Sequence, residues 1–355
     1  MRSTPDVLLL GATGTTAGLI AARLAAAGHT LLLAARDTAR AEVLAAGLPA
    51  GSVEGVRPLD LADPVGLAAL VGGARLTLNT VGPFTRLAGP VIGAALAAGV
   101  PYVDIANEFT AVHELLERDA AARAAGVALV TGAAFGPAAT ESLVLRLRAA
   151  AGGGPLAEVE VAAAPTTAYD TEGVRATVAD ILPEGALSYR AGVLHREPLG
   201  SGVTRRVFGG AGRTVLPAPL GDLAAARHSG GAGTVTAYAL APGERGPFTA
   251  QDRSAAWARA RTADGRTLSA ELDCGEGFAF TAAVAAATVT RLLADPSRPG
   301  AWTACGRYGA ELVEQAGARI TPARDEAVRD EAPQGAAPQD AAPQDAAPQD
   351  AAVAR

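Results

Sequence analysis

The sequence predicts an α/β protein in which a doubly wound parallel sheet is followed by a second, α+β domain with a mixed or antiparallel sheet. Three observations support this prediction. Up to about residue 150, short apolar runs alternate with alanine-rich segments of helical length. A glycine-rich turn joins the first apolar run to the first helical segment. After the Gly-Gly-Gly-Pro sequence at residues 152–155, alternating β-type runs replace this pattern.

The composition excludes several classes of protein. Of the 355 residues, 49% are hydrophobic and 19% are charged, which is enough apolar material to bury a core. The net charge of −6 argues against binding to nucleic acid or to an anionic membrane. All 30 cationic Lys and Arg positions are Arg, which excludes lysine Schiff-base chemistry and a phosphate-loop lysine. Cys274 and Cys305 are too few for a disulfide framework or a cysteine zinc site, and we expect no metal.

The apolar segments do not indicate targeting or membrane insertion. Residues 1–6 are too short for a signal peptide. The most apolar later run, residues 278–293, is interrupted by Arg291 and is shorter than the ~20 residues that a membrane span needs. We therefore expect a cytoplasmic location and no contact with membranes.

Residues 1–150 are expected to form the parallel, doubly wound domain. Strands are predicted over residues 7–10, 30–35, 53–58, 76–80, 102–106 and 127–131, and helices over residues 19–27, 87–98 and 110–125. Short, fully apolar strands that alternate with helices form a parallel sheet covered on both faces. Right-handed crossovers between such strands give a doubly wound, Rossmann-like domain.

Residues 151–298 are expected to form an α+β domain that serves substrate binding or oligomerisation. Strands are predicted over residues 159–164, 204–208 and 234–238. The sequence Ala-Asp-Gly-Arg at residues 263–266 separates two alternating runs and predicts a hairpin, because Asp-Gly tolerates the positive φ of a tight turn. Residues 299–324 form a separate C-terminal segment.

Residues 325–355 form a tail in which Ala-Ala-Pro-Gln-Asp occurs three times between residues 336 and 350. Such a segment has no bulky side chain whose burial would offset the entropy cost of ordering. We expect a disordered tail, and a docking role for it stays open as the alternative.

The segment Gly-Ala-Thr-Gly-Thr-Thr-Ala-Gly at residues 11–18 follows the first strand and opens the first helix. Gly11 permits the tight turn, and Gly14 lets backbone N–H groups approach a pyrophosphate. The N-terminus of the helix adds partial positive charge. We therefore predict a dinucleotide site here, which also includes Thr13, Thr15 and Thr16.

The residues after the second strand favour NADP(H) over NAD(H). A carboxylate there would bind the ribose 2′-hydroxyl of NAD, whereas this chain has Arg36, followed by Arg40. A guanidinium fork suits a 2′-phosphate. Asp37 is open to two interpretations, pairing with Arg40 or facing the ribose. Asp60, after the third strand, is a candidate adenine contact, and an ordinary loop or capping role is the alternative.

The fourth and fifth strands end at the edge of the sheet where the nicotinamide is expected. Residues predicted to contact the cofactor there are Thr80, Val81, Gly82, Pro83 and Phe84. Asp104 and Glu108 follow the fifth strand and could hold ribose hydroxyls or orient a proton donor. Local capping is the alternative for Glu108, since it precedes a helix.

The sequence does not identify the proton donor. The candidate catalytic residues are Tyr102, Glu108, Tyr169 and Asp170, and Glu141, His195 and His228 also carry suitable chemistry. Each of these residue types taken singly is more often structural than catalytic.

Four blocks closely resemble the saccharopine dehydrogenase-like NADP-binding family. They are Gly-Ala-Thr-Gly at residues 11–14, Ala-Arg at 35–36, Asn-Thr-Val-Gly-Pro-Phe at 79–84 and Tyr-Val-Asp-Ile-Ala-Asn-Glu at 102–108. Asn107 and Ala17 stand where the family pattern usually has glycine. The resemblance continues weakly to about residue 320. It implies a Rossmann-like domain plus a mixed-sheet domain, and it leaves open a return of the last helices to the first domain.

The family includes saccharopine reductases and trans-acting enoyl reductases. The resemblance therefore implies an NADPH-dependent oxidoreductase that transfers hydride to a C=N, C=C or C=O bond of a small metabolite. Secondary metabolism is one context in which such an enzyme would act. Two alternatives stay open: a non-catalytic NADP(H)-binding redox sensor, and a trans-acting enoyl reductase that serves a polyketide-type assembly line. The expected partner is a small-molecule substrate, either free or bound to a carrier protein, and a homodimer is also left open.

Overall fold

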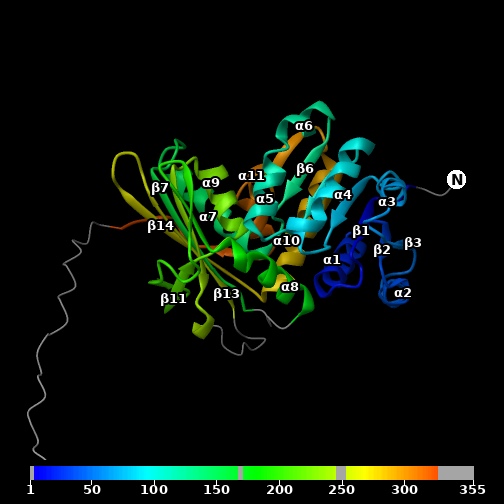
Figure 1. Ribbon diagram of the computed structural model, residues 1–355, viewed down its shortest axis with the longest axis horizontal. Helices are drawn as coiled ribbons and strands as arrows, with labels where there is room; N and C mark the ends of the chain where they lie inside the picture. The colour runs from blue at the N-terminus through cyan, green and yellow to red at the C-terminus, as the bar shows by residue number, and fades with distance from the viewer. Residues whose placement is uncertain (1–3, 167–170, 245–252, 327–355) are drawn as a thin grey trace, which may run out of the picture.

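The computed structural model describes residues 4–166, 171–244 and 253–326 (Figure 1). Two sheets lie side by side, one built mainly from the first half of the chain and the other mainly from the second half. The candidate residues Tyr169 and Asp170 and the repeat tail lie outside the described residues.

The first sheet has seven parallel strands in the order β15-β6-β5-β4-β1-β2-β3. Its strands are β1 (Val7–Leu10), β2 (Leu31–Ala35), β3 (Val53–Pro58), β4 (Leu76–Asn79), β5 (Tyr102–Asp104), β6 (Ala128–Thr131) and β15 (Gly300–Thr303). The predicted parallel, doubly wound sheet is confirmed, and the bounds of its six predicted strands shift by at most two residues. The strand order reverses direction at β1, between β2 and β4, which is where such folds bind ligands.

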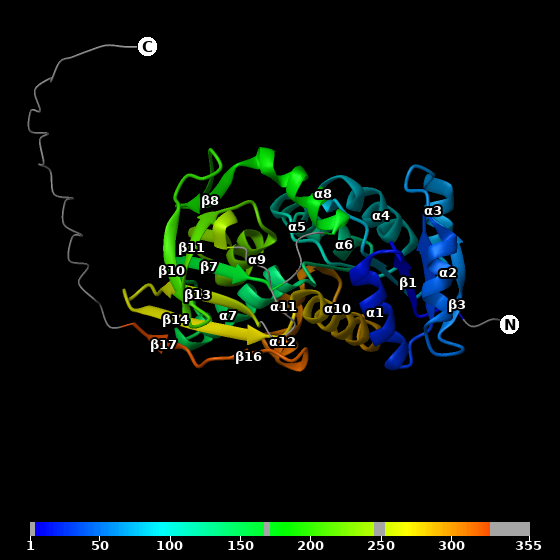
Figure 2. The same cartoon turned by 90° about the horizontal axis from the view of Figure 1, so that it is seen from below.

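Helices cover this sheet on both faces (Figure 2). They are α1 (Thr15–Ala26), α2 (Thr38–Ala46), α3 (Pro64–Val71), α4 (Phe84–Ala98), α5 (Phe109–Leu116) and α6 (Asp119–Ala124). The helix expected over residues 110–125 is therefore two helices, with a turn at Glu117 and Arg118 between them.

The second sheet has ten strands, with β10-β11-β12-β7-β13-β14-β16 as its main order. The strands are β7 (Glu158–Ala164), β8 (Ala186–Arg190), β9 (Val193–Glu197), β10 (Thr204–Phe208), β11 (Ala211–Pro217), β12 (Thr234–Leu240), β13 (Ser254–Arg261), β14 (Thr267–Cys274), β16 (Arg319–Ile320) and β17 (Arg324–Asp325). Only β7 and β12 pair in parallel within the described part of this sheet. The predicted mixed sheet and the β13–β14 hairpin are confirmed, and Gly265 in its turn has φ +89°.

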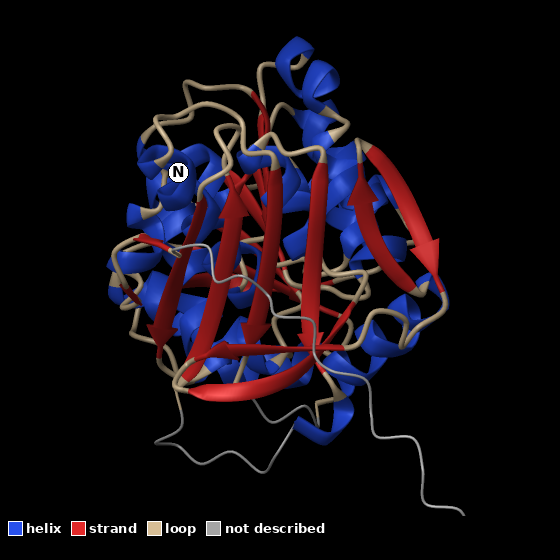
Figure 3. Ribbon diagram, turned by 90° about the vertical axis from the view of Figure 1, so that its left-hand side faces the viewer, coloured by secondary structure: helices blue, strands red, loops and turns tan. Residues whose placement is uncertain are grey.

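Two helices cover one face of the second sheet, α7 (Phe135–Ala150) and α9 (Gly221–Gly230). The other face, seen from the front in Figure 3, is not covered by any α-helix of the described residues. Because α7 follows β6 directly, it connects the two sheets, and one hydrophobic cluster runs continuously from β1 to β14.

Apart from α10, which is described below, the other helical segments are α8 (Glu172–Ile181), η1 (Leu182–Glu184), η2 (Pro242–Glu244), α11 (Ala304–Tyr308) and α12 (Glu311–Gln315).

The chain returns to the first sheet through α10 (Gly277–Ala294), which packs beside α1 (Figure 2). The following strand, β15, then pairs in parallel with β6. Helix α10 falls within the 151–298 region of the sequence analysis but packs against the first sheet. Among the described helices, α10 alone is long and apolar enough to cross a membrane, and 61% of it is buried inside the molecule, as expected of a core helix.

Candidate functional site

The turn between β1 and α1 leaves the N-terminus of α1 open. Gly11 has φ +84° and donates its N–H to Ala34 O at 2.9 Å, which ties the turn to β2. Gly14 precedes α1 without a side-chain cap, and the first turn of the helix has no acidic residue. Gly14 and Thr15 are exposed. The uncapped N–H groups and the positive end of the helix dipole suit a pyrophosphate.

The turn after β4 packs against the glycine turn. A Cβ on Gly11 would lie 2.8 Å from Thr80 Oγ1 and 3.1 Å from the side chain of Val81, so only glycine fits there. Thr80 Oγ1 donates to Leu10 O at 2.7 Å. Gly82, further along this turn, is exposed and precedes the buried Pro83 in a cis peptide bond. The two turns thus form one continuous edge.

Beyond β2, the chain presents two arginines. Arg36 is exposed and has no hydrogen bond or ion pair to another described residue. Arg40 Nη2 donates to Thr13 O at 3.4 Å, which places its guanidinium beside the glycine turn. Asp37 caps α2 by accepting from the backbone N–H of Arg40 at 3.0 Å. This is a helix cap and not an ion pair with the Arg40 guanidinium, and the contact of Asp37 with the ribose stays a prediction.

Asp60 forms a local hydrogen bond in its loop, and its contact with adenine stays a prediction. Its Oδ1 accepts from the backbone N–H of Ala62 at 2.8 Å, within the loop after β3. The residue is exposed, and this local bond accounts for its position.

A buried polar group lies beneath the carboxyl ends of β4, β5 and β6. The Tyr102 hydroxyl donates to Asp104 at 3.0 Å and accepts from Asn79 Nδ2 at 3.1 Å. Asp104 in turn accepts from Thr131 Oγ1 at 2.7 Å. Burial raises the pKa of Asp104 to about 6, and burial together with this carboxyl raises the pKa of Tyr102 well above its usual value. The candidate donor Tyr102 is thus fully buried, and we assign it to the framework of the site.

The Glu108 carboxylate accepts hydrogen bonds from three segments of the chain. Its Oε1 accepts from the backbone N–H of Phe84 at 3.2 Å and from Thr177 Oγ1 at 3.1 Å, and its Oε2 accepts from the N–H of Asn107 at 2.9 Å. The side chain does not cap α5, which begins at the next residue. Glu108 therefore joins the turn after β4 and the loop after β5 to α8. Each of these contacts uses the carboxylate as an acceptor.

Helix α8 packs against the start of α4, next to the turn after β4. Asp180 accepts from Thr85 Oγ1 and from Arg86 Nε, the latter at 2.8 Å. Glu184 accepts from Thr110 Oγ1 at 2.8 Å. Helix α8 was not among the helices predicted from the sequence. Its signals were the capping Thr171, which accepts from the N–H of Val174, and the helical spacing of apolar residues up to Ile181.

The remaining donor candidates lie on other elements. Glu141 on α7 is fully buried, and its carboxylate accepts from Ser229 on α9 and Thr303 on β15. Burial raises its pKa to about 7. His195 lies on β9 and His228 on α9. None of the three has a hydrogen bond to the turns after β1, β4 or β5 among the described residues.

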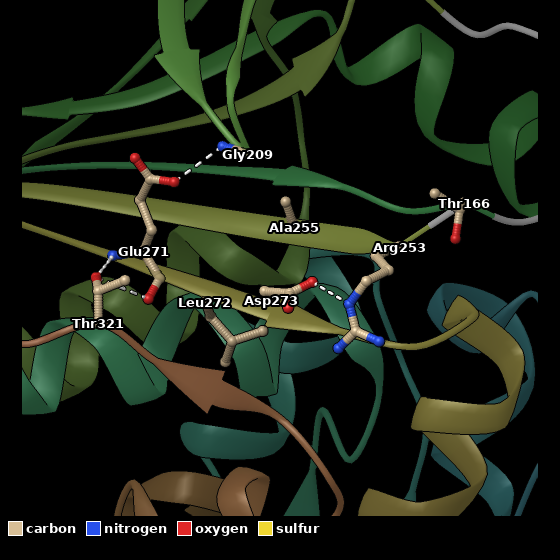
Figure 4. Close-up of a pocket in the computed structure, with 8 residues that line it drawn as sticks. All are labelled: Thr166, Gly209, Arg253, Ala255, Glu271, Leu272, Asp273 and Thr321. Carbon is tan, nitrogen blue, oxygen red and sulfur yellow. Dashed lines mark hydrogen bonds and ion pairs between the residues drawn. The ribbon is translucent and has the colours of Figure 1, made fainter. Parts of the chain in front are cut away.

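A separate cavity of about 460 Å³ lies on the open face of the second sheet (Figure 4). Glu271 accepts from the N–H of Gly209 at 2.9 Å on one side, and Arg253 donates to Asp273 at 2.6 Å on the other. These polar groups satisfy each other, and the cavity has no residue from the glycine turn or the turn after β4. We assign it no part in cofactor binding.

Comparison with known proteins agrees with this geometry. Residues 7–130 match the family described as the saccharopine dehydrogenase NADP binding domain. A trans-acting enoyl reductase of Mycobacterium tuberculosis is 32% identical over 133 residues, which are 36% of this chain and 32% of that protein. A putative trans-acting enoyl reductase of the same organism is 39% identical over 116 residues, 30% of this chain and 27% of that protein. The similarity thus spans about a third or less of each relative's length.

Among solved structures, apo saccharopine dehydrogenase (L-Glu forming) from Saccharomyces cerevisiae aligns with 91% of this chain and 100% of its own, with a TM-score of 0.62 and 15% identity. This likeness extends over both sheets and shows a shared fold. The matched residues 7–130 contain the glycine turn, Arg36, the turn after β4 and Glu108. The match to the saccharopine dehydrogenase NADP binding domain thus includes the edge of the first sheet described above.

Proposed function

We propose that the protein is an NADP(H)-dependent oxidoreductase of the cytoplasm that reduces a C=N, C=C or C=O bond of a small metabolite. The observation that carries the proposal is that an uncapped helix N-terminus at Gly14 occurs together with an exposed Arg36 guanidinium that has no partner among the described residues. The first suits the pyrophosphate of a dinucleotide, and the second suits a 2′-phosphate. The family match over residues 7–130 supports the same cofactor.

The bound cofactor would supply the hydride. The chain's own residues would hold and orient it. Backbone N–H groups in the first turn of α1, from Thr15 on, would bind the pyrophosphate, and Gly14 would leave room for it, with Thr13 and Thr16 beside them. Arg36 and Arg40 face the 2′-phosphate. The turn after β4 lines the path toward the substrate, where exposed Gly82 leaves space that a larger side chain would fill.

Glu108 is assigned a positioning role in this proposal. It accepts from Phe84 N and Thr177 Oγ1, so it fixes the turn after β4 relative to α8. A double bond that is already activated, such as an iminium ion or a conjugated enone, needs little help from a dedicated acid. We infer a substrate of this kind, bound near the exposed Gly82 of the turn after β4.

The relatives named trans-acting enoyl reductases favour one specific version, in which the substrate is an enoyl group carried by a partner protein. NADPH oxidation, followed by absorbance, should be measured with free enoyl thioesters, with the same groups on a carrier protein, and with cyclic imines. Turnover with the carrier-bound group alone supports the trans-acting version. Tight NADPH binding with no oxidation of any of them favours the redox-sensor alternative.

A further inference from the structure

Thr177 of α8 lies at the junction of the two parts of the proposed site. Its hydroxyl donates to Glu108 Oε1 at 3.1 Å. It also lies beside the turn after β4, because a Cβ on Gly82 would be 3.8 Å from Thr177 Oγ1. A residue from the region 151–298 thus reaches the edge formed by residues 1–150.

The packing of the two turns indicates the direction in which a dinucleotide would run along this edge. Gly11 contacts Thr80 and Val81, so the glycine turn meets the start of the turn after β4. Gly82 is one residue further from the pyrophosphate. In a doubly wound sheet the nicotinamide half runs in this direction, toward the ends of β4 and β5. Thr177 therefore lies beside the nicotinamide half and away from the adenine half.

The hydrogen bond to Glu108 determines what the Thr177 hydroxyl can offer a ligand. Its one hydrogen is given to the carboxylate, so the oxygen lone pairs remain as acceptors. The nicotinamide half of NADP(H) carries two kinds of donor, the ribose hydroxyls and the carboxamide NH₂. Both have a hydrogen to donate to such an oxygen.

The position of Thr177 is fixed by the contacts of its own helix. Asp180, one turn later, binds Thr85 and Arg86 on α4. The hydroxyl is thus held in place before any ligand arrives, which lowers the entropy cost of using it.

We propose that Thr177 is a cofactor-binding residue outside the doubly wound domain, accepting a hydrogen bond from the nicotinamide half of NADP(H) while donating to Glu108. This inference rests on the proposed function. It adds a contact that depends on α8 and that the matched domain of residues 7–130 does not contain.

The test compares three ligands by calorimetry on the full chain. The ligand 2′,5′-ADP carries only the adenine half, 2′-phospho-ADP-ribose adds the second ribose, and NADP⁺ adds the nicotinamide. Thr177→Val and Thr177→Ala remove the hydroxyl, and Thr177→Ser keeps it. Thr110→Val is the matched control, because it removes the neighbouring contact of Glu184 without touching Glu108.

We expect Thr177→Val and Thr177→Ala to weaken NADP⁺ binding by about two- to tenfold, as for the loss of one neutral hydrogen bond. Binding of 2′,5′-ADP should be unchanged, and Thr177→Ser and Thr110→Val should match wild type. An equal loss for 2′-phospho-ADP-ribose assigns the donor to the ribose, and a loss for NADP⁺ alone assigns it to the carboxamide.

Two results would overturn the proposal. Unchanged NADP⁺ affinity in both hydroxyl-free variants, or an equal loss of 2′,5′-ADP affinity, removes Thr177 from the cofactor site while leaving the proposed function intact. A wild-type protein that binds neither NADP⁺ nor NADPH removes the proposed function and this inference together.

Discussion

Gly136, in the first turn of α7, packs directly against the carboxylate of Asp222 on α9. A Cβ on Gly136 would lie 2.8 Å from Asp222 Oδ2 and 2.6 Å from Asn107 Oδ1. Asp222 is 1% exposed, and its other oxygen accepts from Thr140 Oγ1 at 3.2 Å. The absence of a side chain at Gly136 thus lets α7, α9 and the loop after β5 meet.

Gly136→Ala is therefore expected to destabilise the protein. Overpacking of this kind costs about 1–3 kcal/mol, because buried side chains must move. Gly89→Ala and Gly93→Ala in α4 are matched controls, since nothing lies within 4 Å of their added Cβ atoms. They should stabilise the helix by roughly 0.5–1 kcal/mol. Urea unfolding measures all three, and a neutral Gly136→Ala would contradict the packing described.

Gly14→Val and Gly82→Val should separate the two halves of the cofactor site. An added Cβ at either position meets only ordinary van der Waals contacts, at 3.5 Å or more, so both variants should fold. Gly14→Val should abolish binding of NADPH, because its side chain blocks the pyrophosphate. Gly82→Val should abolish turnover and weaken NADPH while 2′,5′-ADP still binds. Normal turnover in Gly82→Val would place the reaction elsewhere.

Arg36→Ala should weaken NADPH far more than NADH. Loss of a charge-assisted hydrogen bond to phosphate costs about 1.5–3 kcal/mol, or roughly ten- to a hundredfold in the dissociation constant. Arg23→Ala is the control, because Arg23 lies in the last turn of α1, away from the phosphate end. Fluorescence titration with both cofactors provides the measurement. Equal wild-type affinities for NADPH and NADH would contradict the assignment of Arg36.

The stability of the protein should fall as the pH rises from about 5 to 8. Burial raises the pKa of Asp104 and Asp222 to about 6 and that of Glu141 to about 7. The folded chain therefore keeps these protons at pH values where the unfolded chain has lost them. The resulting stabilisation is complete below the unfolded values, near pH 4, and is lost as the pH rises through 6 to 7.

Glu141→Gln isolates one part of this decline. Glutamine keeps an oxygen that can accept from Ser229 and Thr303 but cannot ionise. The free energy of unfolding of the variant should fall less than that of wild type between about pH 6 and 8. Desolvation lowers the pKa of His228, which acts in the opposite sense, but this group is common to both proteins. Parallel pH profiles would exclude Glu141 as the responsible group.

Local sequence patterns were enough to predict much of the fold and part of the candidate site. Most strands of the first sheet are short apolar runs, and the turn after β1 needs glycine at Gly11 for its backbone path. The Asp-Gly turn between β13 and β14 also depends only on neighbouring residues. Such features follow from the conformations that a few consecutive residues prefer, so they can be read without knowing the rest of the chain.

Other features depended on contacts between segments far apart in the sequence. The sequence alone determined a glycine turn, an arginine after β2 and alternating strands and helices. Only the tertiary structure decided that β15 pairs with β6, that α10 packs beside α1, and that Thr177 meets Glu108. The physical reason is that such contacts depend on which edges and faces are left to be covered once the sheets have formed. Residues as ordinary as Thr177 give no local signal of this outcome.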